Sequence, residues 1–132
     1  MPKLQELHLY ANQMTGSIPT EVGLASKLES LRLESNLFTG SLPSEIGSLT
    51  LLTDLDLKNN AFTGSIPAQY GRLAELEEWT LEGNLLTGEI PLEVCDLLKE
   101  KLGQFVVDCR DERRQIGFDC VPTCCTICRK LS

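Results

Sequence analysis

Leucine residues recur along this chain with a period of 24 residues, and each recurrence contains a short alternation of apolar and polar positions. In LESLRLESN, for example, the triplet Leu31-Arg32-Leu33 has the period of two that is typical of a strand with one buried face. The pattern predicts a short strand in every repeat, with residues such as Arg32 pointing outward. The four segments LQELHLYAN, LESLRLESN, LTDLDLKNN and LEEWTLEGN begin at Leu4, Leu28, Leu52 and Leu76.

A second segment follows each strand in the same register and reads MTGSIP, FTGSLP, FTGSIP or LTGEIP. Its glycine permits a close backbone approach, and its proline suits the start of a short helical turn. Ile46 and Leu49, three residues apart, fit the apolar edge of such a turn. An asparagine amide can satisfy backbone groups that a turn leaves unpaired. We therefore expect a structural role for the recurring asparagines Asn12, Asn36, Asn60 and Asn84.

Repetition at this period predicts a solenoid of the α/β class, because each unit can bury its apolar side only against its neighbours. The strands would form one parallel sheet with a spacing of about 4.8 Å. Gly23, Gly47 and Gly71 recur in the helical turns, but Cys95 holds the fourth equivalent position, so we expect a cap to begin near Cys95. The predicted organisation is four repeats within 1–99, at 4–27, 28–51, 52–75 and 76–99, followed by a cysteine-rich cap at 100–132.

The net charge of −7 is concentrated in the repeats, where residues 1–99 hold 14 acidic and 6 basic side chains. Such a surface argues against a nucleic-acid partner, since phosphate binding needs clustered basic residues. The chain has no phosphate-binding loop, no kinase signature, no signal peptide and no stretch long enough to span a membrane. A solenoid end needs a cap, and nothing before Leu4 supplies one, so we expect an N-terminal cap, further repeats or both to be missing.

These residues resemble the plant-type extracellular leucine-rich repeat family, whose repeat reads LxxLxLxxNxLTGxIPxxLGxLxx. The resemblance covers 4–99, and the Thr-Gly-x-Ile-Pro element makes it specific. It implies a curved solenoid with a parallel concave sheet, and short helical or 3-10 turns on the convex side. It also implies a ligand-recognition module outside the cell, secreted or in a membrane-tethered ectodomain. Two departures are Trp79, which replaces a strand leucine, and GLASKL, which lacks the usual leucine after Gly-x.

All six cysteines lie in the last part of the chain, at Cys95, Cys109, Cys120, Cys124, Cys125 and Cys128. We expect them to form disulfides, each adding about 2–4 kcal/mol to a segment with little core, in an oxidising compartment. Zinc is disfavoured because structural sites use two separated cysteine pairs, and a redox role because CTIC lacks a strand–helix context. The segment CVPTCCTIC resembles the cysteine-dense endings of leucine-rich repeat proteins from unicellular algae such as diatoms.

The outward strand positions form three columns across the predicted sheet. The column nearest the strand start is Glu6, Ser30, Asp54 and Glu78; the central column is His8, Arg32, Asp56 and Thr80; the last column is Tyr10, Glu34, Lys58 and Glu82. Opposite charges on neighbouring strands predict an Arg32–Asp56 pair and a Glu34–Lys58–Glu82 ladder. Trp79 is predicted to point into the core.

Asp54 and Glu78 are like charges on neighbouring strands, which is unfavourable without a nearby cation. We predict that this acidic patch receives a basic group of a peptide or protein partner, or less readily calcium. The alternative is a solvated pair helped by Arg32 from the diagonal position. His8 does not suggest catalysis, because it lies on an open face with Ser30 diagonal to it and Asp56 two strands away. His8 and Tyr10 are better contact residues.

The sequence therefore predicts a non-enzymatic recognition module that needs no metal or cofactor and binds a protein or peptide through its concave or lateral face. Two alternatives remain. One is a structural or cell-wall spacer whose acidic surface only confers solubility. The other is an inhibitor of a secreted hydrolase, which would use the same face against the rim of an active site.

Overall fold

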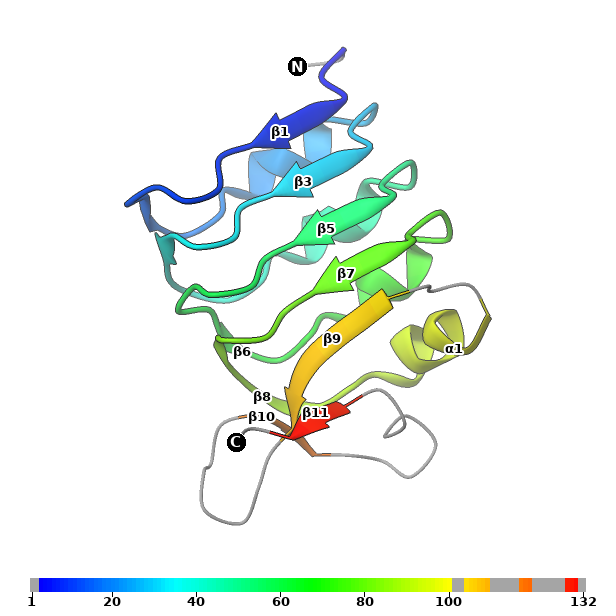
Figure 1. Ribbon diagram of the computed structural model, residues 1–132. Coiled ribbons are helices and arrows are strands. Elements are labelled where there is room, and N and C mark those ends of the chain that lie inside the picture. Colours follow the sequence, from blue (N-terminus) through cyan, green and yellow to red (C-terminus); the bar gives the residue numbers. More distant parts are fainter. Residues whose placement is uncertain (1–2, 101–103, 110–116, 120–127, 131–132) are drawn as a thin grey trace.

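Five parallel strands lie side by side along the axis of the solenoid, as the computed structural model shows (Figure 1). They are β1 (Glu6–His8), β3 (Ser30–Arg32), β5 (Asp54–Asp56), β7 (Glu78–Thr80) and β9 (Gln104–Cys109). The register pairs Leu7 with Leu31, Leu31 with Leu55, and Leu55 with Trp79. The structure describes residues 3–100, 104–109, 117–119 and 128–130, with side chains as far as Leu97. The predicted in-register strands are confirmed.

A second parallel array of short strands runs beside the first. It contains β2 (Thr15–Gly16), β4 (Leu37–Phe38), β6 (Thr63–Gly64) and β8 (Leu85–Glu89), and β10 (Gly117–Asp119) joins β8 to β9. The backbone N–H of Thr39 donates to Gly16 at 2.8 Å, and that of Thr63 donates to Gly40 at 2.9 Å. Gly16 and Gly40 have φ of 84° and 79°, a left-handed conformation that glycine adopts without steric cost. The repeated TG element therefore builds this second array.

Short 3-10 helices lie on the side of the solenoid opposite the β1–β3–β5–β7 sheet (Figure 1). They are η1 (Thr20–Leu24), η2 (Ser44–Ser48) and η3 (Ala68–Arg72), and α1 (Leu92–Glu100) takes the fourth place. Pro19, Pro43 and Pro67 precede the three 3-10 helices in an extended conformation. The predicted turns after each proline are confirmed, and they are 3-10 rather than α in the first three repeats.

The recurring glycines of these helices allow neighbouring coils to touch. A β-carbon on Gly23 would lie 2.8 Å from the backbone oxygen of Glu45, and one on Gly71 would lie 2.7 Å from that of Glu93. Gly47 meets Gln69 in the same way. A separation below 3.0 Å is shorter than real side chains tolerate. The glycine column is therefore a packing requirement of the stacked helices.

The core is a ladder of leucines that ends in large aromatic side chains. Leu28, Leu31, Leu52 and Leu55 have no exposed surface. Trp79 is also fully buried, as predicted, and its ring lies 5.8 Å from that of Tyr70. Burial on this scale contributes about 25 cal/mol per Å² of apolar surface, which makes the ladder the main source of stability.

The recurring asparagines satisfy backbone groups of the turns, as predicted; Asn12 is exposed and does so within its own coil, whereas the three that follow also connect consecutive coils. Asn36 Nδ2 donates to Leu9 O at 2.8 Å and to Leu33 O at 3.1 Å, and its Oδ1 accepts from the backbone N–H of Met14 at 3.1 Å. Asn60 and Asn84 repeat this arrangement one and two coils further on. Each of these three amides thus satisfies backbone groups in two coils at once.

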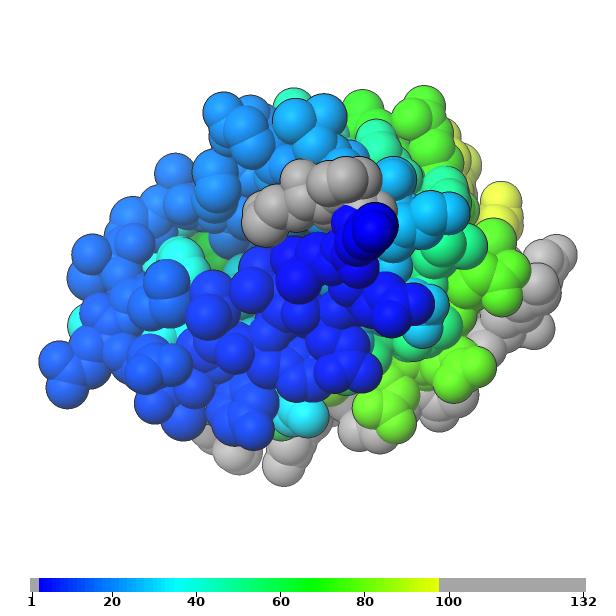
Figure 2. All heavy atoms as spheres, turned by 90° about the horizontal axis from the view of Figure 1, so that it is seen from above, coloured from blue at the N-terminus to red at the C-terminus, as the bar shows by residue number. Residues whose placement is uncertain are grey.

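The first coil is packed on one side only among the described residues. Leu7 and Leu9 are half-buried, whereas their equivalents Leu31 and Leu33 are at most 3% exposed. The view from the N-terminal end (Figure 2) shows this coil lying over the later ones, which emerge along one side of it. A cavity of about 250 Å³ opens here between Leu7, Met14 and Phe38.

The region predicted as a cap contributes strands to both arrays. β9 continues the concave sheet, with Gln104 paired to Glu78 at a shift of 26 residues rather than 24. β11 (Cys128–Lys130) pairs with β9. Cys95 is buried and disulfide-bonded. The other five cysteines lie outside the residues whose side chains are described, so the predicted disulfide cap as a whole stays a prediction.

Candidate functional site

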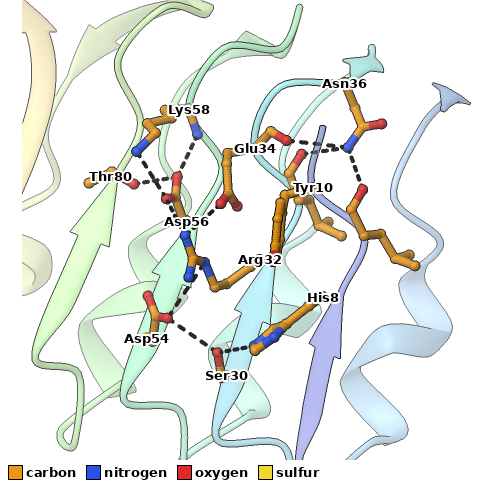
Figure 3. Close-up of polar contacts among 12 residues, drawn as sticks. His8, Tyr10, Ser30, Arg32, Glu34, Asn36, Asp54, Asp56, Lys58 and Thr80 are labelled. Carbon is orange, nitrogen blue, oxygen red and sulfur yellow. Dashed lines mark hydrogen bonds and ion pairs between the residues drawn. The ribbon is translucent and has the colours of Figure 1, made fainter. Parts of the chain in front are cut away.

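The outward side chains of β1, β3, β5 and β7 form the three columns expected from the sequence. Glu6, Ser30, Asp54 and Glu78 are successive partners in the register, and so are His8, Arg32, Asp56 and Thr80. Backbone hydrogen bonds keep the third column stacked beyond the strand ends, from Ala11 to Glu34, Ser35 to Lys58 and Asn59 to Glu82. We call this surface the concave face; Figure 3 shows the polar part of it.

Arg32 lies at the centre of the concave face and contacts three carboxylates (Figure 3). Its Nη2 donates to Glu34 Oε1 at 2.7 Å and lies 3.9 Å from Asp56 Oδ2, and its Nε lies 4.0 Å from Asp54 Oδ2. Partial burial acts to lower the pKa of Arg32, but the Glu34 hydrogen bond and the three negative charges outweigh it and raise that pKa. Arg32 therefore serves as the internal counterion of the acidic cluster.

Asp56 is a buried carboxylate whose hydrogen-bonding capacity is well used. Thr80 Oγ1 donates to its Oδ1 at 2.6 Å, the backbone N–H of Lys58 donates to the same oxygen at 3.2 Å, and Lys58 Nζ lies 3.3 Å from Oδ2. The predicted Arg32–Asp56 pair is present, although it is long. The predicted Glu34–Lys58–Glu82 ladder is wrong, because the Lys58 ammonium turns to Asp56 on its own strand.

A chain of hydrogen bonds runs from His8 through Ser30 to Asp54. His8 Nε2 lies 2.8 Å from Ser30 Oγ, and Ser30 Oγ donates to Asp54 Oδ2 at 3.2 Å. An ionised carboxylate can only accept, so the Ser30 proton points to Asp54 and His8 Nε2 must donate to Ser30. A histidine that activates a serine has to accept its proton instead. The chain positions these side chains and does not have the geometry of a hydrolytic relay.

Asp54 and Glu78 are neighbours in the register, as predicted. Burial raises the pKa of Asp54, while the Ser30 hydrogen bond and the Arg32 charge oppose that shift and the Glu78 charge adds to it. Arg32 therefore assists Asp54 from the diagonal position. Glu78 is exposed.

Tyr10 is the exposed aromatic group of the concave face. Its side chain is 48% exposed, and the Arg32 guanidinium lies 5.1 Å from the centre of its ring. The His8 ring is 6.2 Å from the same ring on the other side. Tyr10 is therefore an aromatic side chain that solvent reaches, and its role as a contact residue stays a prediction.

Two carboxylate oxygens on the third column have no hydrogen-bond partner, a feature that sequence reasoning missed. They are Glu34 Oε2 and Glu82 Oε2, and both atoms are shielded from solvent. Glu34 is only 6% exposed overall. A charged acceptor that is buried and unpaired costs free energy. The sequence does carry one relevant signal. Glu34, Lys58 and Glu82 alternate in charge along the column, but Lys58 has a nearer acidic partner, Asp56, on its own coil.

A second surface, also missed, lies over β2, β4 and β6. We call it the lateral face; it consists of Thr15, Ser17, Leu37, Thr39, Ser41, Ala61, Thr63 and Ser65. The segments 12–18, 36–42 and 60–66 contain no charged residue, although 23% of the whole chain is charged. Ser41 pairs with Thr63 across the array. The surface therefore presents hydroxyl and methyl groups at regular intervals without charge.

The residues that the structure describes contain no group of three or more histidine, cysteine, aspartate or glutamate side chains placed to hold a metal ion. Within the same ranges, no helix has the length and apolarity needed to cross a bilayer.

The chain is similar to proteins built of leucine-rich repeats. The family model described as Leucine Rich Repeat matches residues 3–24, 27–49 and 51–73. The chain is similar to the plant peptide hormone receptor RGFR1, solved in complex with RGF2, at 35% identity and a TM-score of 0.73. That match covers 83% of this chain and 18% of the receptor chain. No curated protein sequence matches.

Two further solved structures show the same likeness. One is the BIR3–SERK2 complex from Arabidopsis thaliana, with 34% identity and a TM-score of 0.68 over 82% of this chain and 58% of that one. The other is a plant ice-binding protein, with 36% identity and a TM-score of 0.72 over 80% of this chain and 36% of that one.

The chain thus spans between 18% and 58% of the length of these three structures. The family model matches more than half of the residues, and the matched segments contain the core leucines of the first three coils. The chain belongs to the leucine-rich repeat family.

Proposed function

We propose that this protein is a non-enzymatic recognition module whose concave face binds a peptide or protein outside the cell. The observation that carries the proposal is the concave face itself. Its columns of polar side chains are held on a rigid, in-register sheet and are linked by hydrogen bonds and ion pairs. The similarity to a plant peptide hormone receptor supports the same function and an extracellular location.

The charge of the concave face indicates a basic ligand. It carries six carboxylates and two permanent positive charges, Arg32 and Lys58, and both of these charges already contact acidic groups. A basic ligand would be attracted and steered by this excess, whereas an acidic one would be repelled. The six acidic residues are Glu6, Glu34, Asp54, Asp56, Glu78 and Glu82.

Affinity capture with a concave-face variant tests the proposal. The immobilised chain and the double variant Asp54→Asn/Glu78→Gln would be incubated with native extracellular fluid, and Glu75→Gln, exposed and off this face, serves as the control. We expect a discrete ligand on the wild-type chain and the control that the double variant loses. Equal retention by all three would place the ligand elsewhere. Retention of nothing by any of them would favour a structural spacer.

A second candidate function, adsorption to ice, is favoured by the lateral face. Its hydroxyl-bearing side chains repeat about every 4.8 Å between coils and about every 7 Å along a coil. A rigid, uncharged and regular face can meet an ordered solid at many points, whereas a charged or irregular one cannot. One of the similar structures is a plant ice-binding protein.

Inhibition of ice recrystallisation tests this candidate. Thr39→Lys and Thr63→Lys place charges in the middle of the lateral face and should abolish inhibition by the wild-type chain. Thr50→Lys, which changes an exposed threonine that follows η2 on the opposite side of the coil, should leave it intact. A wild-type chain that does not slow recrystallisation, or lysine variants as active as the wild type, would remove ice binding from consideration.

A further inference from the structure

We infer that the ligand of the concave face is an extended peptide segment with two basic side chains three residues apart, one received by Glu34 and the other by Glu82. The inference rests on the proposed peptide-binding function and names the chemistry of the ligand. It also adds two contacts in the third column to the one expected at the Asp54–Glu78 pair of the same face.

The first argument is the unused capacity of the two glutamates. Glu34 is more than nine-tenths buried and donates nothing, so its two oxygens need hydrogen-bond donors. Arg32 satisfies Oε1 at 2.7 Å, and Oε2 has no partner. Glu82 Oε2 is also shielded from solvent and has no hydrogen-bond partner. Among the residues whose side chains the structure describes, these are the only buried carboxylate oxygens left unpaired.

The internal cations are committed elsewhere. Lys58 lies between Glu34 and Glu82 in the column, but its ammonium contacts Asp56 at 3.3 Å. Arg32 is shared among three carboxylates. Asp54, in contrast, already accepts from Ser30 and is assisted by Arg32. The buried acceptors that remain for a ligand are therefore in the third column, beside the exposed Glu78 of the first.

The spacing of the two glutamates sets the spacing of the ligand groups. Glu34 and Glu82 hold equivalent positions two coils apart, and the backbone bonds Ser35 N–Lys58 O and Asn59 N–Glu82 O keep those coils stacked. Two strand separations amount to about 10 Å. A polyproline II segment advances about 3.1 Å per residue with three residues per turn, so side chains at i and i+3 share a face about 9 Å apart. Such a segment crossing the strands would reach both glutamates.

The negative charge of the concave face and the solvent exposure near the two glutamates favour a basic ligand group over a neutral hydrogen-bond donor. The concave face carries an excess of four negative charges, counting its six carboxylates against Arg32 and Lys58. Hydrogen bonds between ionised partners are about twice as strong as neutral ones. Arg32 and Lys58 flank the glutamates and have side chains 37% and 34% exposed, so a ligand can approach this part of the column from solvent. Tyr10 lies beside Glu34 (Figure 3) and is 48% exposed, so its side chain can pack against the ligand.

Synthetic peptides test the spacing directly. The probe is a fluorescein-labelled proline-rich peptide with two arginines separated by two prolines. The comparison peptides separate the arginines by one or three prolines, or replace both by citrulline, a neutral isostere. Fluorescence anisotropy with the 132-residue chain would measure each Kd at low and moderate salt. We expect the two-proline peptide to bind at least tenfold more tightly than every comparison peptide.

Protein variants locate the contacts. Glu34→Gln and Glu82→Gln should each weaken the two-proline peptide at least fivefold and reduce its advantage over the citrulline peptide. The matched control Glu75→Gln should change neither. Circular dichroism melting confirms that each variant is folded, and the citrulline comparison on the wild-type chain needs no variant at all.

Equal affinity for all arginine spacings, or no binding of the two-proline peptide, would overturn the inference. The proposed function is judged separately, because it depends on whether the native ligand is lost from the Asp54→Asn/Glu78→Gln variant. A native ligand that binds the concave face without a basic pair would leave that function standing and reject only the inference.

Discussion

Gly71 and Glu93, which belong to adjacent coils, are packed so closely that a β-carbon on the glycine would lie 2.7 Å from the backbone oxygen of the glutamate. The contact joins η3 to α1, the last helix of the described convex side. Since the obstacle is backbone and not the end of a flexible side chain, it cannot move away without shifting a whole coil.

Gly71→Ala should therefore be destabilising despite the higher helix propensity of alanine. Overpacking of this kind costs about 1–3 kcal/mol. Urea denaturation followed by circular dichroism would measure the loss. Ser48→Ala, an exposed position of η2, is the control and should lie within about 0.5 kcal/mol of the wild type. A Gly71→Ala variant as stable as this control would show that the coils are less tightly stacked.

Ser35→Gly should be stabilising. Ser35 has a φ of 58°, and the equivalent position in the fourth repeat is Gly83 with a φ of 73°. A residue with a β-carbon is strained by about 1–2 kcal/mol in this left-handed conformation, and glycine removes that strain. Glycine also gives the unfolded chain more conformational freedom, which cancels part of the gain. We expect a net gain of up to about 1 kcal/mol in urea unfolding. Ser26→Gly, at an exposed residue without positive φ, should instead lose stability.

Arg32→Gln should destabilise the protein at neutral pH and much less in acid. Removing the cation leaves Glu34, Asp54 and Asp56 facing one another without their counterion. Arg32 is partly exposed, so solvent screens the effect and we expect a loss of about 1–2 kcal/mol at pH 7. At low pH the carboxylates protonate and the repulsion disappears. Urea unfolding at both pH values checks this, and a loss that does not depend on pH would contradict it.

Asp54→Asn should gain stability relative to the wild type as pH rises. Burial raises the pKa of Asp54 in the folded protein above its ordinary value of 3.8, so the folded state binds the proton more tightly than the unfolded state does. That contribution is complete below pH 3.8 and is lost as pH rises through the elevated folded-state pKa. Asparagine does not titrate and escapes the loss.

Urea unfolding in steps from acid to neutral pH would follow this difference. Asp96→Asn, an exposed position in α1, provides the reference for removing a single charge. The opposite result would be a wild type that becomes more stable than Asp54→Asn as pH rises, while Asp96→Asn shows no such trend. That result would mean that Arg32 and Ser30 dominate the environment of Asp54.

The site was only partly predictable. Periodicity of two placed His8, Arg32 and Asp56 outward in one column, and the register of the sheet bears this out. The partner of Lys58 was mispredicted, since column geometry favours Glu34 and Glu82 on the neighbouring coils. The observed contact is with Asp56, two residues away on the same edge. A long flexible side chain can reach several acids, and the choice among them depends on burial, which no single sequence position encodes.

The sequence by itself determined the register of the coils, the inward leucines and Trp79, the hydrogen-bonding role of the recurring asparagines and the turns after each proline. It could do so because each of these features depends on a local pattern repeated every 24 residues. Only the tertiary structure decided that β9 adds a fifth strand, that the TG segments of neighbouring coils pair to build the lateral face, and that Glu34 and Glu82 keep unpaired oxygens. These features arise where residues from different coils meet, and their energies depend on distances and burial that exist only after the coils have stacked.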